Sequence, residues 1–174
     1  FIVSGDFGEL RSKTVLVATG TSLSPKGVKG EKEHLGKGVS YCATCDGAFY
    51  KGKDVAVIGY QDHAVEDALY LSPLVNRLYF VFPKLLQASE EHERQLKACS
   101  NVEGIHGKLL SVEGDLRVDR IEIQTESGVQ SISVSGVFPL SDEQSASMFL
   151  APLSPATEKG FLKVNEARMT SVPG

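Results

Sequence analysis

The segment Tyr41–Ala64, YCATCDGAFYKGKDVAVIGYQDHA, decides the fold because it joins two recognisable patterns. Its first half holds a Cys-x-x-Cys followed directly by Asp46. Its second half holds a short apolar run, Asp54–Ile58, which stops at Gly59 and leads into helical spacing. That order is typical of the strand, turn and helix of a nucleotide-binding fold. The segment therefore predicts an α/β domain that carries a close cysteine pair.

The sequence after this segment continues the alternation of strands and helices. Apolar residues from Ala64 to Leu71 gather on one face of a helix that ends before Pro73. The run RLYFVF at Arg77–Phe82 predicts a strand, and a polar helix is expected from Ser89 to about Cys99. Strands that alternate with helices in this way predict a parallel sheet with crossover connections.

The remaining elements are predicted from shorter patterns. Alternating polar and apolar residues in Gly107–Gly136 predict an antiparallel meander. TVLVA at Thr14–Ala18 predicts a buried strand, and GFLKV near the end predicts another. Ser141 with Gln144 matches a capping box, which predicts a short helix from Asp142 to about Leu150. The stretch Thr21–Gly38, rich in Gly, Lys and Ser, is expected to be a surface connection.

These elements predict a Rossmann-like three-layer domain, with a parallel central sheet and an antiparallel β meander on one side. We place domain boundaries after residues 23 and 154, so that residues 24–154 form the central domain. The chain begins at Phe1 rather than Met and ends on SVPG, and both ends read as cuts in a longer polypeptide.

Composition narrows the class of protein. The 174 residues include 18 Lys and Arg against 22 Asp and Glu, for a net charge of −4 with neutral histidines. This mild acidic excess, without a basic stripe, argues against nucleic acid as a partner. No apolar run approaches the roughly 18 residues that indicate a membrane span, and the first ten residues lack the pattern of a signal peptide. We therefore expect a cytoplasmic protein that does not bind membranes.

The three cysteines are Cys42, Cys45 and Cys99, and the close pair favours redox chemistry. Two intervening residues let both sulfurs converge where a helix begins, so that the pair can cycle between dithiol and disulfide. Asp46 offers a carboxyl group that can move the proton. Two alternatives stay open: a zinc site, with Cys99 and His106 or His92 as distant ligands, and a pair of inert core cysteines. We predict no metal.

The sequence GKGVSYCATCDGAFYKGKDVAVIG strongly resembles the low-molecular-weight thioredoxin reductases, which are FAD-dependent pyridine nucleotide–disulfide oxidoreductases. The resemblance extends to VLVATG at Val15–Gly20, to VEDALYL at Val65–Leu71 and to TSVPG at Thr170–Gly174. It implies that residues 1–23 and 155–174 are remnants of a FAD-binding domain. The central domain is then the nucleotide-binding domain, with hinges near Leu23 and Pro155.

The resemblance also implies roles for individual residues. Cys45 faces the flavin and takes its electrons, Cys42 attacks the disulfide of a thioredoxin-like partner, and Asp46 is the acid. Thr19 and Gly20 lie on the flavin side. The implied enzyme is a homodimeric thioredoxin-disulfide reductase that holds FAD only as the full-length protein, and we expect the fragment alone to be inactive.

The nucleotide-binding loop departs from the family's pattern at its second glycine. A dinucleotide-binding turn reads Gly-x-Gly-x-x-Gly or Ala, because the second glycine lets the backbone touch the pyrophosphate. Here Gly59 and Ala64 satisfy the first and third positions, but Gln61 replaces the second. Its neighbour Asp62 adds a negative charge. The loop therefore predicts weakened binding of a dinucleotide.

Two further departures concern the same ligand. NADPH-dependent members of the family place a His-Arg-Arg cluster where this chain has Phe82-Pro83-Lys84, so only Lys84 offers a positive charge. The stretch Pro139–Asp142 replaces a later nucleotide-binding segment of the family. NADPH is therefore doubtful, and we predict ferredoxin or another electron donor.

Two other functions stay open. One is a conventional NADPH-dependent thioredoxin reductase with a variant loop, and the other is a degenerate domain that serves as a docking or regulatory module. His63 is interpreted as an exposed turn residue rather than a catalytic base.

Overall fold

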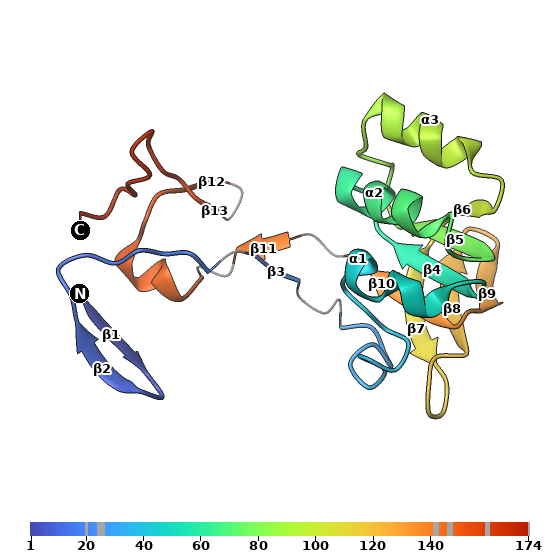
Figure 1. The fold of residues 1–174 in the computed structure, drawn as a ribbon, viewed down its shortest axis with the longest axis horizontal. Coiled ribbons are helices and arrows are strands. Elements are labelled where there is room, and N and C mark those ends of the chain that lie inside the picture. The colour runs from blue at the N-terminus through green and yellow to red at the C-terminus, as the bar shows by residue number, and fades with distance from the viewer. Residues whose placement is uncertain (20, 24–26, 141–142, 146–147, 159–160, 174) are drawn as a thin grey trace. The chain divides into compact units, whose positions relative to one another are not determined.

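A computed structural model describes residues 1–19, 21–23, 27–140, 143–145, 148–158 and 161–173 (Figure 1). The chain divides into two compact units. The first combines Phe1–Ser24 with Asp142–Gly174, and the second is Pro25–Ser141. Residues 142–154 thus group with the flanking segments rather than with the central domain, to which the sequence analysis assigned them. That the flanks are remnants of a FAD-binding domain stays a prediction.

The second unit is built on a four-stranded parallel sheet. Its strands lie in the order β10 (Gly136–Pro139), β4 (Asp54–Ile58), β5 (Arg77–Phe82) and β6 (Val102–His106). Each neighbouring pair is parallel. The strands predicted at Asp54–Ile58 and Arg77–Phe82 are therefore confirmed. Short apolar runs of this kind suit a parallel sheet, whose two faces are both covered.

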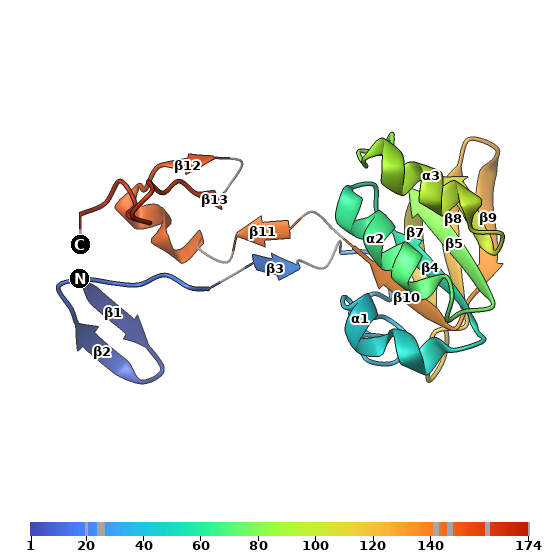
Figure 2. The ribbon, with the colours of Figure 1, turned by 45° about the horizontal axis from the view of Figure 1, so that its top comes forward.

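Two helices cover one face of this sheet (Figure 2). They are α2 (Asp62–Leu71) and α3 (Glu90–Ala98), which confirm the two predicted helices. Ser89 caps α3, since its Oγ accepts the backbone N–H of His92 at 3.3 Å. The apolar side chains between the sheet and the helices form one cluster, which includes Val55, Val57, Ala64, Val65, Ala68, Leu71, Leu78, Phe80, Leu96 and Phe138.

The antiparallel meander covers the opposite face. It consists of β7 (Lys108–Glu113), β8 (Arg120–Thr125) and β9 (Gly128–Ser133). Successive side chains of a strand point to opposite faces, so Ala56 and Ile58 face away from the helices. They join a second cluster, which includes Val81, Ile105, Leu109, Val112, Ile121, Ile123 and Ile132. The predicted three-layer fold, with its meander on one side, is confirmed.

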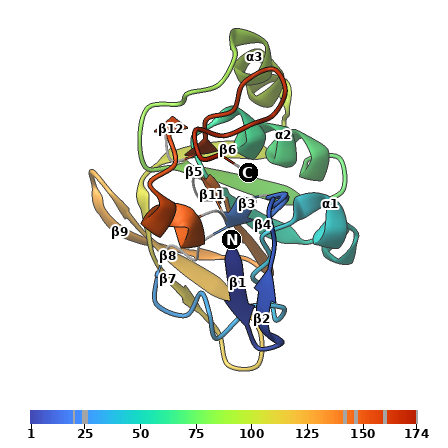
Figure 3. The ribbon, with the colours of Figure 1, turned by 90° about the vertical axis from the view of Figure 1, so that its left-hand side faces the viewer.

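The first unit contains short two-stranded pairings. A hairpin joins β1 (Ile2–Gly5) to β2 (Gly8–Arg11), as Figure 3 shows. The other pairs are β3 (Thr21–Leu23) with β11 (Glu143–Ser145), and β12 (Thr157–Glu158) with β13 (Phe161–Leu162). The strand predicted at GFLKV is thus present only as the two residues of β13.

Two predictions in this unit are wrong. Thr14–Ala18 forms no strand, and Leu16 is 92% exposed, because no described segment pairs with this run. The predicted helix Asp142–Leu150 is replaced by β11 and by the 3-10 helix η2 (Met148–Leu153). Pairing with β3 overrides the local capping pattern at Glu143–Ser145. The capping residue Ser141 lies outside the described residues.

Within the described residues, no helix combines the length and the apolar character that a membrane crossing requires.

Candidate redox site

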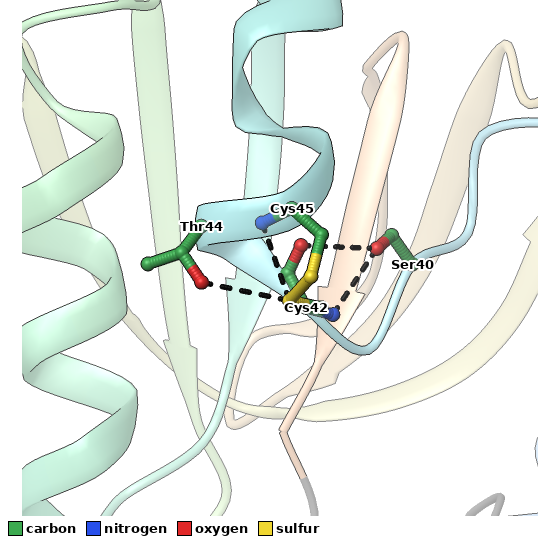
Figure 4. Close-up of a disulfide and its surroundings, with 4 residues drawn as sticks. All are labelled: Ser40, Cys42, Thr44 and Cys45. Atoms are coloured by element: carbon green, nitrogen blue, oxygen red, sulfur yellow. Dashed lines mark hydrogen bonds between the residues drawn. A yellow bond between two sulfur atoms is a disulfide. The ribbon is translucent and has the colours of Figure 1, made fainter.

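The structure joins Cys42 and Cys45 in a disulfide at the start of helix α1 (Ala43–Asp46), with their Cα atoms 5.3 Å apart (Figure 4). Cys42 is the N-cap residue in an extended conformation, and Cys45 lies in the first turn. This geometry explains the spacing of the motif, because the turn folds the second sulfur back onto the first. Asp46 ends α1, and the 3-10 helix η1 (Gly47–Tyr50) follows.

Two hydrogen-bond donors lie at the sulfur of Cys42, whereas none of the residues that the structure describes donates to the sulfur of Cys45. The Cys45 backbone N–H donates to Cys42 Sγ at 3.2 Å, and Thr44 Oγ1 lies 3.5 Å from the same sulfur (Figure 4). Ser40 Oγ accepts the Cys42 N–H at 3.1 Å and donates to its carbonyl at 3.3 Å. Donors of this kind stabilise a thiolate once the disulfide is reduced.

A buried carboxylate holds the residue that precedes Cys42. Glu31 is 0% exposed, and it accepts the Tyr41 hydroxyl at 3.0 Å and the Val28 N–H at 3.1 Å. His34, also buried, contacts the carbonyls of Gly30 and Gly114 through its two ring nitrogens. The expectation that Thr21–Gly38 is only a surface connection is therefore wrong for Glu31 and His34, since polar composition does not reveal a buried hydrogen-bonded group.

We expect the hydrogen bond between Tyr41 and Glu31 to make the free energy of unfolding depend on pH in the alkaline range. Burial, the hydrogen bond to Glu31 and its charge together raise the pKa of Tyr41 from 10.0 to about 12. A raised folded-state pKa stabilises the fold fully below pH 10, and this contribution is lost as pH rises towards 12. Phenolate absorbance of Tyr41→Phe should therefore lack one of the late-titrating tyrosines that the wild type shows, leaving Tyr50 as the other tyrosine with a raised pKa.

The same variant can be checked by denaturation. The urea midpoint of Tyr41→Phe should lie below that of the wild type at neutral pH, and the gap should narrow as pH rises through this window. Tyr70→Phe, at an exposed tyrosine, is the control and should follow the wild type throughout. A gap for Tyr41→Phe that stays constant up to pH 12 would contradict the assignment.

Asp46 lies in a partly buried corner. Burial and the Asp46 charge raise the pKa of Tyr50, while Arg117 lowers it. Tyr50 itself packs edge-on against Phe138, with ring centroids 5.3 Å apart. Asp46 is therefore fixed beside the disulfide by its position at the end of α1.

An exposed aromatic side chain follows the redox pair by four residues in the sequence. Phe49, in η1, is 73% exposed although its neighbour Tyr50 packs into the core. Tyr70 of α2 is partly exposed and packs at Gly47, where an added Cβ would lie 3.2 Å from Tyr70 Cε1. Nothing in the sequence distinguishes Phe49 or Tyr70, since their exposure is apparent only in the folded chain.

The altered nucleotide-binding loop, Gly59–Ala64, is packed against neighbouring residues of the same domain. Tyr60 is only 9% exposed, and Lys84 Nζ lies 4.9 Å from the centre of its ring. The Tyr60 carbonyl accepts the Gln87 N–H, and Gln61 forms a β-bridge with Gln87. Gly59 is needed for packing, since a Cβ there would lie 2.4 Å from that of Ala64. The loop thus keeps the close helix packing of a dinucleotide-binding turn but not its open backbone.

The end of this loop is tied to α3. Asp62 Oδ1 accepts the Ser89 N–H at 2.9 Å and contacts His92 Nδ1 at 2.8 Å. These two interactions, with the Ser89 N–H as the larger effect, lower the pKa of Asp62. The carboxylate that the sequence analysis placed near a phosphate site therefore serves as a link between α2 and α3.

The structure does not bring the remaining candidate site residues to the disulfide. Thr19 is exposed, and Gly20 lies outside the described residues. Cys99 Sγ contacts the Gln95 carbonyl and Ser72 Oγ, whereas His92 contacts Asp62, so neither lies with the disulfide. Among the described residues, no three or more His, Cys, Asp or Glu side chains gather as a metal site.

His63 differs from its predicted state. It was interpreted as an exposed turn residue, but its Nε2 is buried and has no hydrogen-bond partner among the described residues. The interpretation failed because α2 begins at Asp62, so His63 already belongs to the packed helix.

Comparisons with known proteins find thioredoxin reductases and, among other relatives, alkyl hydroperoxide reductase subunits F, such as that of Xanthomonas campestris pv. phaseoli at 35% identity over 95% of this chain and 32% of that protein. No protein-family model matches the chain. The thioredoxin reductase of Aquifex aeolicus is 37% identical over 174 residues, which cover 97% of this chain and 54% of that protein. The chain spans about half the length of the curated relatives it matches.

Solved structures give the same result. The thioredoxin reductase of Lactococcus lactis matches with a TM-score of 0.85 and 26% identity, covering 97% of this chain and 57% of that one. A ferredoxin-flavin thioredoxin reductase from Clostridium acetobutylicum matches with a TM-score of 0.56 and 33% identity, covering 89% of this chain and 49% of that one.

Proposed function

We propose that this chain, a homologue of the thioredoxin reductases over about half of their length, carries the redox disulfide of a flavoprotein that reduces a thioredoxin-type disulfide. The observation that carries the proposal is the Cys42–Cys45 disulfide, whose first sulfur accepts a hydrogen bond from the Cys45 N–H. The homology supports the class of enzyme, and the disulfide supports the residues through which it acts.

The reductive half of the reaction is thiol–disulfide exchange. The Cys42 thiolate attacks one sulfur of the partner disulfide, and the partner's other sulfur leaves as a thiol after taking a proton, for which Asp46 is the proposed donor. Cys45 then attacks Cys42, which releases the second partner thiol and reforms the intramolecular disulfide. Two electrons and two protons pass to the partner, and the chain's two thiols become one disulfide.

A two-electron donor must reduce the Cys42–Cys45 disulfide again after each turnover. In the proposed full-length protein, reduced FAD would supply these two electrons. We propose that FAD is held only by the full-length protein; the exposure of Thr19 and the lack of a strand at Thr14–Ala18 support this. Apolar side chains of the first unit are also exposed, among them Ile2, Phe7 and Leu10. This exposure supports their burial in a larger flavin-binding domain.

Phe49 is the proposed contact for the partner protein. Phe49 is exposed and lies in the 3-10 helix that directly follows α1, so its ring offers a docking protein an apolar anchor on the segment next to the redox pair. Tyr70 extends the same corner of the molecule. A thioredoxin-like protein that presents its own disulfide next to an apolar surface fits this arrangement.

The electron donor is proposed to be ferredoxin or another carrier rather than NADPH. Gln61 and the buried Tyr60 fill the loop in which a dinucleotide needs open backbone, and Lys84 lies over the Tyr60 ring. One similar solved protein is named a ferredoxin-flavin thioredoxin reductase. A homodimer and a cytoplasmic location complete the proposal.

A non-enzymatic docking or regulatory module is the second candidate, and the degenerate nucleotide loop favours it. The two functions can be separated by counting thiols in the full-length protein before and after photoreduction of its flavin under anaerobic conditions. The proposed enzyme should gain two thiols per chain, both absent in the Cys42→Ser/Cys45→Ser double variant. An unchanged thiol count with fully reduced flavin would favour the docking module.

A further inference from the structure

Two hydroxyl side chains contact Cys42, and they act on different parts of it (Figure 4). Ser40 Oγ accepts the Cys42 N–H at 3.1 Å and donates to the Cys42 carbonyl at 3.3 Å, so it holds the backbone. Thr44 Oγ1 lies 3.5 Å from Cys42 Sγ, so it acts on the sulfur itself. A sulfur in a disulfide carries no hydrogen, and the Thr44 hydroxyl is therefore the donor.

Of the two donors to this sulfur, only Thr44 depends on the identity of a side chain. The other donor is the Cys45 backbone N–H, at 3.2 Å. Any residue except proline would present that N–H, because the first turn of α1 directs it to the N-cap residue. The hydroxyl, in contrast, is lost when position 44 holds an apolar residue. The residue between the two cysteines can thus change the charge on Cys42 without changing the turn.

The hydrogen bond from Thr44 has its largest effect once the disulfide is reduced. A reduced Cys42 that loses its proton carries a negative charge, and hydrogen bonds to a charged group are stronger than those to a neutral one. The hydroxyl therefore stabilises the thiolate more than it stabilises the thiol or the disulfide. Among the residues that the structure describes, none donates to Cys45 Sγ, so this stabilisation favours one sulfur of the pair.

We propose that Thr44 is a positioning residue that keeps the negative charge of the reduced pair on Cys42 rather than on Cys45. The inference rests on the proposed function, in which Cys42 attacks the partner and Cys45 resolves the mixed disulfide. A charge on Cys42 favours the first step, because the thiolate is the nucleophile. A Cys45 that keeps its proton does not compete for the partner disulfide. Thr44 thereby helps to set the order in which the two sulfurs react.

The test measures how alkylation of Cys42 by iodoacetamide depends on pH in the full-length protein. Cys45→Ser/Cys99→Ser is the background, since it leaves Cys42 as the one cysteine of these 174 residues, and mass spectrometry follows the peptide that contains it. In this background, Thr44→Val should raise the midpoint of the pH profile by about half a unit, or about threefold less thiolate below the midpoint. The rate on the alkaline plateau should stay within about twofold, because it reports access to the sulfur.

Two matched variants separate the hydroxyl from the bulk of the side chain. Thr44→Ser keeps the hydroxyl and should restore the midpoint of the background, whereas Thr44→Ala should shift it as Thr44→Val does. Thr44 is exposed, so these changes should leave the fold intact. The titratable side chains of α1, of η1 and of α2, which packs against α1, are the same in every variant and cancel in the comparison: Asp46, Tyr50, Asp62, His63, Glu66, Asp67 and Tyr70.

An unchanged midpoint in Thr44→Val and Thr44→Ala would overturn the inference, as would a Thr44→Ser midpoint that shifts with theirs. A change confined to the plateau rate would also overturn it, since that result assigns to Thr44 a role in access alone. Alkylation requires neither reduction of the flavin nor a partner protein. Failure of the proposed enzyme function would therefore appear in the thiol count after photoreduction and not in this pH profile.

Discussion

Replacing Cys42 with Ser in the full-length protein is expected to lower the turnover of a thioredoxin-type disulfide by about 1000-fold or more, as removal of a nucleophile does in other enzymes that use covalent intermediates. The variant lacks the sulfur to which the Cys45 N–H donates a hydrogen bond, and therefore has no thiolate to attack the partner. Neither the fold nor the packing of α1 should change, since Ser is nearly isosteric and the reduced state already lacks the bond.

Cys45→Ser should also stop turnover, but at a different point. Cys42 can still attack the partner disulfide, yet no second sulfur is present to release the product. A stable mixed disulfide between Cys42 and the partner should therefore accumulate and be visible on a non-reducing gel. Cys42→Ser should give no mixed disulfide with the partner, because it lacks the attacking sulfur.

Cys99→Ser is the control for both variants, and its turnover should stay within about twofold of the wild type, because a half-buried thiol held against helix α3 has no place in the exchange. Appreciable turnover by Cys42→Ser, or an adduct formed through Cys45 instead of Cys42, would contradict the assigned roles.

The architecture of the second unit could be predicted because its elements follow simple periodicities. In β4, Val55 and Val57 face the helices while Ala56 and Ile58 face the meander, so an unbroken apolar run correctly indicated a strand buried on both faces. The alternation in β8 and β9 likewise matched a sheet with one buried face. In each case the local pattern and the final packing agree.

The first unit could not be predicted in the same way, because its pairings depend on distant segments. Thr14–Ala18 has the composition of a strand but no described neighbour to complete its backbone hydrogen bonds. Glu143–Ser145 has a local helix signal, yet it pairs with β3 more than a hundred residues earlier. Strand pairing over such a separation is not encoded in any short window of sequence.

The site was only partly predictable for a similar reason. The spacing of Cys42 and Cys45 indicated a disulfide because the geometry lies within one turn. Glu31 could not be found, since nothing in a Gly- and Lys-rich stretch indicates that one carboxylate is buried under Tyr41.

The second large effect concerns the nucleotide loop. NADPH is expected to reduce the flavin of the full-length wild-type protein at least about 100-fold more slowly than a donor that does not need this loop, such as photoreduction or a reduced ferredoxin. The reason is steric, since a glycine at the second position of the motif lets the backbone approach the pyrophosphate and Gln61 does not. The buried Tyr60 ring adds to the obstruction.

Reopening the loop should reverse part of this loss. The double variant Tyr60→Gly/Gln61→Gly is expected to bind NADPH at least about tenfold more tightly than the wild type, measured by calorimetry on the same protein, because it restores the open backbone of the motif. Binding should stay weaker than in a dedicated site, since Lys84 supplies a point charge rather than the paired donors of arginine.

Gln61→Ala is the control that distinguishes backbone approach from the amide side chain. It removes the amide but keeps a Cβ at the position that the motif reserves for glycine, so its gain should be well below that of Gln61→Gly. Removal of the buried Tyr60 ring also costs stability, and Gln61→Gly alone serves if the double variant unfolds. If NADPH reduces the wild-type flavin rapidly, or if the glycine variants bind it no better, the loop does not determine the choice of donor, and the conventional NADPH-dependent enzyme becomes the better description.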